Sequence, residues 1–158
     1  MKHCLRFISL LLAFCWSSSF AQVVADGEQS GTDSITAKEY SLAVNIRGRE
    51  ITGICIINIS ADSSIVGTVV NEFGLKAFDF SYSSEKARIF NVMSPLDKWY
   101  IRKILRNDFR FILSNMFVNG DVISEKRRTM KKLPNGEITI ENNRHKISYT
   151  FLPLIEIE

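Results

Sequence analysis

The sequence predicts an α+β domain in which a curled antiparallel β-sheet, an unclosed half-barrel, wraps around one kinked helical segment. Two observations lead to this fold class. Runs of alternating apolar and polar residues, joined by short turns, lie on both sides of a single stretch with helical periodicity. A sheet built from so many consecutive strands must bury its apolar face against that one helical element.

The first 21 residues have the composition of a secretory signal peptide. Lys2 and Arg6 form a basic start, residues 7–16 form an apolar core too short to span a bilayer, and Ser19 and Ala21 are small residues at the cleavage positions. We therefore expect export and cleavage after Ala21. Residues 22–38 are polar and read as a flexible leader, and residues 39–158 read as one β-rich domain.

A lipoprotein signal is the alternative, with Cys15 as the lipidated residue. The bulky Phe14 stands where such sites have a small residue, so we favour simple cleavage.

Eight strands are expected from the apolar pattern and the turn residues between the runs. Five precede the helical segment, at 40–46, 51–59, 65–72, 76–82 and 87–92, and three follow it, at 122–132, 137–142 and 145–151. The run at 51–59 is apolar on both faces, which favours a central strand.

The helical segment is expected at 94–117. Ser94 suits the N-cap and Pro95 the first helical position. After Arg106 the apolar stripe shifts around the helix, and Asn107 and Asp108 are both good N-terminal residues for a new helix. The pattern therefore predicts a kink or break near Asn107.

Charge is divided unevenly along the chain. Residues 22–93 carry 6 basic and 9 acidic side chains, whereas residues 94–158 carry 12 basic and 8 acidic ones. Together these are 18 basic and 17 acidic side chains, and a net charge this close to zero argues against a nucleic-acid-binding protein. Four cations, Lys98, Arg102, Arg106 and Arg110, form one stripe along the expected helix. Such a stripe is usually a solvated face, and the functional alternative is attraction to an anionic membrane surface or an acidic partner.

Catalytic or metal-binding chemistry finds little support. His145 and Cys55 are the only histidine and cysteine after residue 21, too few for a zinc site or a Cys/His dyad. We expect His145 to be exposed and Cys55 to be a buried small hydrophobe. The expectation is a protein that is not an enzyme and that needs no metal or cofactor.

Aromatic side chains concentrate in the fourth and fifth strands and the helical segment. On a curled sheet, these could line a cavity for an acyl chain or fill a solid core. The candidates for lining an acyl-chain cavity are Phe78, Phe80, Phe90, Trp99 and Leu105.

Two stretches, NEFGLKAFDF (71–80) and SPLDKWYIRKILRNDFRFIL (94–113), resemble the lipoprotein-localisation (LolA/LolB) superfamily in an exported chain of consecutive strands. The resemblance implies an unclosed β-barrel with a helical lid over a hydrophobic cavity that binds lipoprotein acyl chains in a Gram-negative periplasm. It also implies that Phe73 and Leu75 could form a loop that contacts the membrane.

The expected function is therefore a non-catalytic cell-envelope protein that binds lipid or lipoprotein acyl chains, with lipoprotein transport to the outer membrane as its specific form. It would lie in the periplasm or at the periplasmic face of the outer membrane. The alternative is an envelope interaction module with a filled core and a basic docking surface.

Overall fold

The computed structural model describes residues 36–154. The predicted signal peptide, with the lipidation alternative at Cys15, and residues 22–35 of the predicted leader lie outside the described residues. The last three residues of that leader, 36–38, belong to the first strand, because Thr36 pairs with Ile59. The leader therefore ends earlier than predicted.

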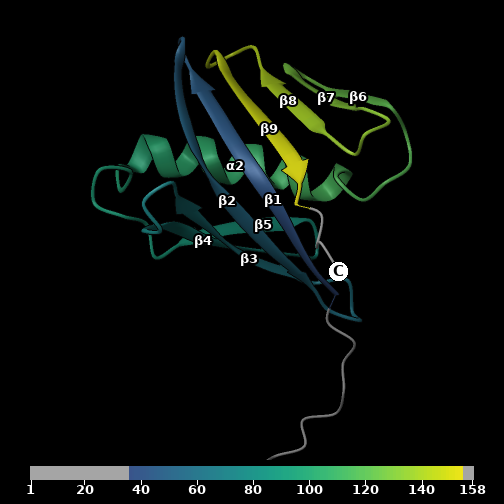
Figure 1. The fold of residues 1–158 in the computed structure, drawn as a ribbon, viewed down its shortest axis with the longest axis horizontal. Coiled ribbons are helices and arrows are strands. Elements are labelled where there is room, and N and C mark those ends of the chain that lie inside the picture. The colour runs from purple at the N-terminus through teal and green to yellow at the C-terminus, as the bar shows by residue number, and fades with distance from the viewer. Residues whose placement is uncertain (1–35, 155–158) are drawn as a thin grey trace, which may run out of the picture. The chain divides into compact units, whose positions relative to one another are not determined.

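Nine strands form one antiparallel sheet, and one long helix accompanies them (Figure 1). The elements are β1 (Thr36–Ile46), β2 (Arg49–Ile59), β3 (Ile65–Asn71), β4 (Lys76–Ser83), β5 (Lys86–Phe90), α2 (Trp99–Asn115), β6 (Val122–Glu125), β7 (Arg128–Lys132), β8 (Ile138–Asn142) and β9 (Ile147–Pro153). The predicted α+β class with an unclosed antiparallel sheet is confirmed.

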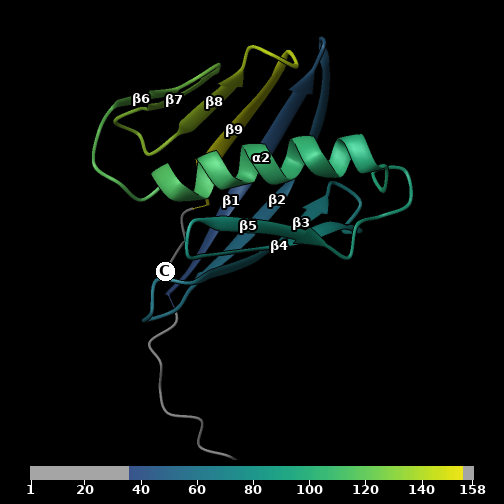
Figure 2. The same ribbon diagram turned by 180° about the vertical axis from the view of Figure 1, so that it is seen from behind.

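The sheet is a simple meander in two halves joined through β1. The strand order is β5-β4-β3-β2-β1-β9-β8-β7-β6, so that β1 pairs with its sequence neighbour β2 on one side and with β9 on the other. Helix α2 crosses the sheet between the two halves, with β3, β4 and β5 on one side of it and β7, β8 and β9 on the other (Figure 1 and Figure 2). The β1–β9 pairing thus joins the two halves into one open sheet that curves around the helix.

The predicted strand at 122–132 is two strands, which corrects the expected eight to nine. A tight turn at Lys126 and Arg127 separates β6 from β7, and Glu125 pairs with Arg128 across it. Lys126 adopts a left-handed conformation with a φ of 56°. Glycine or asparagine usually takes that conformation, so the sequence carried no turn signal here.

Helix α2 differs from the prediction at both its start and its middle. Ser94 is not the cap: residues 94–97 form a turn in which the Asp97 amide bonds the Ser94 carbonyl oxygen, and Lys98 is the N-cap residue, without a capping side chain. The helix also runs through Asn107 without interruption (Figure 2). The predicted kink or break is therefore wrong.

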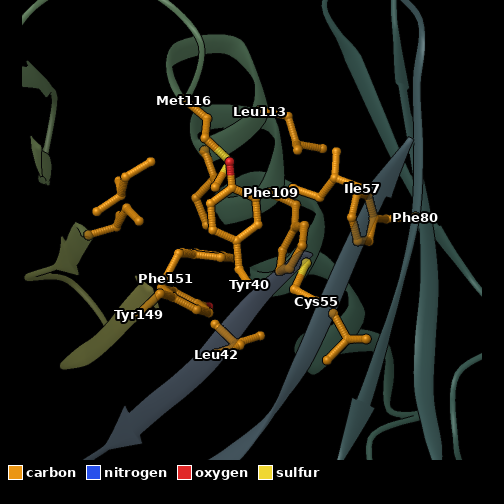
Figure 3. Packing of buried hydrophobic residues seen from close by; sticks show 14 of the residues in the cluster. Tyr40, Leu42, Cys55, Ile57, Phe80, Phe109, Leu113, Met116, Tyr149 and Phe151 are labelled. Carbon is orange, nitrogen blue, oxygen red and sulfur yellow. The ribbon is translucent and has the colours of Figure 1, made fainter. Parts of the chain in front are cut away.

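The apolar residues fill the concave side of the sheet beneath the second half of α2. Phe109, Leu113 and Met116 from the helix meet Tyr40, Leu42, Cys55, Ile57, Phe80 and Phe151 from the strands (Figure 3). Cys55 is fully buried, as predicted, and burial raises the pKa of its thiol to about 12, so it is a packing residue.

Gly67 on β3 permits the closest approach in this core. A Cβ atom added to it would lie 2.3 Å from the ring of Phe80 and 2.4 Å from the carbonyl oxygen of Ile56. The missing side chain therefore lets the Phe80 ring lie directly on the β3 backbone.

Two phenylalanines on neighbouring strands differ in burial, so their substitution compares a core position with a surface position. Phe80 is fully buried, whereas 39% of Phe90 is exposed. We expect Phe80→Ala to lower the free energy of unfolding by about 3–5 kcal/mol, because it leaves a large cavity. Phe90→Ala should cost about 1 kcal/mol or less, since surface truncations have small effects. Urea unfolding followed by circular dichroism measures both, and equal losses would contradict this packing.

Candidate functional site

An apolar cavity of about 650 Å³ lies between the first half of α2 and the concave face of the sheet. It is partly open to solvent. Its walls come from β1, β2, β3, β4, β9, the turns at their ends and the helix. The lining residues are Leu42, Val44, Ile46, Arg47, Ile51, Thr52, Gly53, Val69, Val70, Asn71, Ala77, Phe78, Leu96, Tyr100, Ile101, Ile104, Leu105, Phe109, His145, Ile147 and Tyr149.

The cavity exists because only the second half of α2 is packed tightly on the sheet. Phe111, Ile112 and Leu113 are buried, whereas Ile101, Ile104 and Leu105 are only half-buried although they carry large apolar side chains. The first half of the helix thus presents an apolar face that the sheet does not fill. A site of this volume lies within the range of small-molecule pockets, about 300–1,000 Å³.

Small side chains and a bulge shape the opposite wall. Gly53 contributes no side chain, and Ala77 contributes a single methyl group. The β3–β4 register shifts between Val69 and Val70, so that Val69 faces Phe78 and Val70 faces Lys76. This bulge leaves Ala77 unpaired and turns both Ala77 and Phe78 toward the interior, where both are buried.

The five predicted cavity residues divide into two groups. Phe78 and Leu105 line the cavity. Phe80, Phe90 and Trp99 do not, which corrects the expected lining. Phe80 lies in the filled core, and Trp99 at the helix start is 77% exposed, edge-on to Tyr100. Phe90 is on the edge strand β5 and faces a different groove.

Phe109 forms the boundary between the cavity and the filled core. Its ring centroid lies 5.2 Å from that of Phe78 in an edge-on arrangement, 5.0 Å from that of Phe80, and 6.4 Å from that of Tyr149. Such tilted and edge-on contacts are favourable for aromatic rings. The concave face of the sheet is thus solid on one side of Phe109 and hollow on the other.

A buried carboxylate holds α2 to the sheet one residue before this boundary. Asp108 is 1% exposed, and one of its oxygens accepts hydrogen bonds from Arg128 Nε on β7 and Asn142 Nδ2 on β8, both at 2.7 Å. Its other oxygen accepts a hydrogen bond at 2.9 Å from the hydroxyl of Tyr149 on β9. One helical side chain therefore joins three consecutive strands.

The tyrosine of this cluster remains protonated. Burial raises the pKa of Tyr149 well above its usual value, and the neighbouring Asp108 carboxylate raises it further. Tyr149 therefore keeps its proton at physiological pH and donates a hydrogen bond to Asp108. The sequence prediction missed this cluster because it assigned Asp108 to a helix start. A single acidic residue next to Phe109 on an apolar stripe could have indicated a buried carboxylate with partners elsewhere in the chain.

The predicted membrane-contact loop is an exposed hairpin tip at the edge of the cavity. Phe73 and Leu75 are 78% and 59% exposed. Asn71, which lines the cavity, accepts hydrogen bonds through its side-chain oxygen from the amides of Phe73 and Leu75 at 3.0 and 2.9 Å. The tip is therefore a fixed apolar projection.

The predicted basic stripe is divided between paired and exposed cations. Arg102 is half-buried and pairs with Asp97, and Arg110 lies 3.6 Å from Glu125. Lys98 and Arg106 are exposed, and neither forms an ion pair with another residue of 36–154. Arg106 and Arg110 also line a polar groove beside β5, together with Lys86, Arg88 and Phe90.

Within residues 36–154, no cluster of three or more His, Cys, Asp or Glu side chains is placed to hold a metal ion. No helix in the same range is long and apolar enough to cross a bilayer. No protein-family model matches the chain, and no match was found among curated proteins.

Removal of the Asp108 carboxylate tests the role of this cluster. We expect Asp108→Ala to lower the free energy of unfolding by about 3–5 kcal/mol, because Arg128 would keep a largely buried charge without a partner. The matched control is Asp97→Ala, which removes the exposed pair with Arg102 and should cost about 0–1 kcal/mol. Chemical denaturation measures both variants, and similar small losses would show that Asp108 is not an anchor.

Proposed function

We propose that this chain is a non-catalytic protein of the cell envelope that binds the acyl chains of lipids or lipoproteins in the cavity beneath α2. The observation that carries this proposal is the cavity itself: about 650 Å³, lined almost entirely by apolar side chains, in a sheet whose other half is filled. Each methylene group moved there from water contributes about 0.8 kcal/mol, so a chain of many methylenes would bind favourably.

The volume fits one chain of ordinary length. A water molecule occupies about 30 Å³ in the liquid. Since a methylene group is of similar size, the cavity has room for roughly 20 such groups. The half-buried Ile101, Ile104 and Leu105 would gain contacts from such a chain, which would complete the packing that the sheet leaves open.

Export and delivery are further parts of the proposal. The proposed location is the periplasm or the periplasmic face of the outer membrane of a Gram-negative bacterium, and the signal-like composition of the N-terminal segment supports export. The exposed tip formed by Phe73 and Leu75, followed directly by the exposed Lys76, would contact an anionic membrane. This assignment resembles the LolA/LolB role in lipoprotein transport to the outer membrane.

The interaction module is the second candidate function. The groove beside β5 supports it, because Lys86, Arg88, Arg106 and Arg110 line it with Glu85 as the single acid. An acidic segment of a partner protein would complement this charge. The two candidates differ in what they require of the cavity, since only lipid binding needs it to be accessible.

A larger side chain inside the cavity tests the proposal. Ile104 on α2 points into the empty space, so Ile104→Trp should fill part of the cavity with little loss of stability and lower the affinity for a fluorescent fatty-acid probe by about tenfold or more. The matched control is Ile54→Trp on β2, because Ile54 is 39% exposed and does not line the cavity. Fluorescence titration measures both.

Wild-type protein that binds no probe would overturn the acyl-chain proposal and favour the interaction module. Equal affinities of the wild type and of the Ile104→Trp variant would show that the probe binds elsewhere.

A further inference from the structure

The ionisable side chains in the cavity lining include basic residues but no acidic ones among residues 36–154. Among residues 36–154, Arg47 and His145 are the only lining residues that can carry a positive charge, and no aspartate or glutamate of that range lines the cavity. Of the two tyrosines in the lining, Tyr149 already donates a hydrogen bond to Asp108. The cavity therefore has apolar walls, and only Arg47 and His145 can give its described lining a positive charge.

Two of the other polar lining residues already hold a hydrogen-bond partner. The hydroxyl of Thr52 donates to Glu72 at 2.9 Å, and the side-chain oxygen of Asn71 accepts the amides of the β3–β4 tip. The side chains of Arg47 and His145 form no hydrogen bond or ion pair within residues 36–154. The side chains of Arg47 and His145 are thus both available to form hydrogen bonds with a ligand.

The backbone brings Arg47 and His145 to the same end of the cavity. Arg47 is in the β1–β2 turn and His145 in the β8–β9 turn, and the Arg47 amide donates a hydrogen bond of 3.2 Å to the carbonyl oxygen of Lys146. Strand β1 pairs with β9 down to Ile46 and Ile147, which lie directly before and after these turns. Two turns that are distant in sequence therefore form one rim.

The buried carboxylate network also positions the second of these turns. The side-chain oxygen of Asn142 accepts hydrogen bonds from the amides of Arg144 and His145 at 3.1 and 3.3 Å, while its side-chain nitrogen donates to Asp108. The turn that carries His145 is thus tied to the same carboxylate that anchors α2. This corrects the expectation that His145 is simply exposed, because it is half-buried at the cavity.

We propose that Arg47 and His145 form a headgroup site, and that the ligand is a single-chain amphiphile with a compact anionic head, namely a long-chain carboxylate. This inference rests on the proposed acyl-chain function. The guanidinium of Arg47 matches a carboxylate in a two-point hydrogen bond, and the His145 imidazole supplies a further N–H donor. Exposed Arg144 and Lys146 add positive charge to the turn that carries His145, and exposed Glu50 at the start of β2 is the acid nearest to Arg47 in the sequence.

Matched ligands with the same chain test the headgroup site. We would compare laurate and dodecanol below their critical micelle or solubility limits by calorimetric titration into the full exported chain. Wild-type protein should bind laurate at least tenfold more tightly than dodecanol, because only the carboxylate can form charge-assisted hydrogen bonds with the rim.

Matched variants locate the effect. Arg47→Gln and His145→Gln should each weaken laurate binding, by about tenfold for Arg47→Gln, and leave dodecanol binding unchanged. The control is Arg49→Gln, because Arg49 belongs to the same hairpin but does not line the cavity, and it should bind laurate as the wild type does. Thermal unfolding of each variant verifies that the fold is retained.

The possible failures are distinguishable. If laurate and dodecanol bind equally well and no variant separates them, the headgroup site is wrong and acyl-chain binding stands. If Arg49→Gln weakens laurate binding as much as Arg47→Gln does, general surface charge explains the effect and the site is again wrong. If neither ligand binds, the proposed function fails together with this inference.

Discussion

The hydrogen-bonded carboxylate of Asp108 is the constraint on which the rest of the structure depends. It joins the middle of α2 to β7, β8 and β9 through Arg128, Asn142 and Tyr149, and a buried carboxylate is stable only with such a full set of partners. Every buried side-chain nitrogen and oxygen of the described residues has a hydrogen-bond partner. The three bonds of Asp108 hold the middle of the helix against β7, β8 and β9.

The hollow under the first half of α2 follows from this anchor. Beyond Asp108 the helix packs closely on the sheet, and Phe109 closes that core with aromatic contacts on both halves of the sheet. Before Asp108, no buried hydrogen-bond cluster within residues 36–154 holds the helix, and its apolar side chains line the cavity together with Gly53 and Ala77. A protein that only needed stability would fill this volume. The unfilled half is the observation on which the proposal of a bound acyl chain rests.

The sequence predicted the elements better than it predicted their details. Strand positions and the buried Cys55 followed from alternation and composition, because these patterns are local. The kink failed because a buried acidic residue such as Asp108 imitates a helix start until its partners, which lie 20 to 41 residues away, are known. The prediction of the cavity lining was only partly correct. A bulge near Val70 and the loosely packed first half of α2 determine which side chains line the cavity, and neither can be read from the sequence pattern. His145 was missed for the same reason, because only the β1–β9 pairing brings its turn to the rim.

Residue-level hydrogen exchange along α2, with and without a saturating long-chain carboxylate, tests the central claim most directly. An anchored second half and an unfilled first half should differ in local stability. The account predicts that amides of residues 109–115 are strongly protected in both states, while those of residues 102–106 exchange faster in the free protein and become protected when the ligand is added. Uniform protection along the whole helix, unchanged by the ligand, would contradict it.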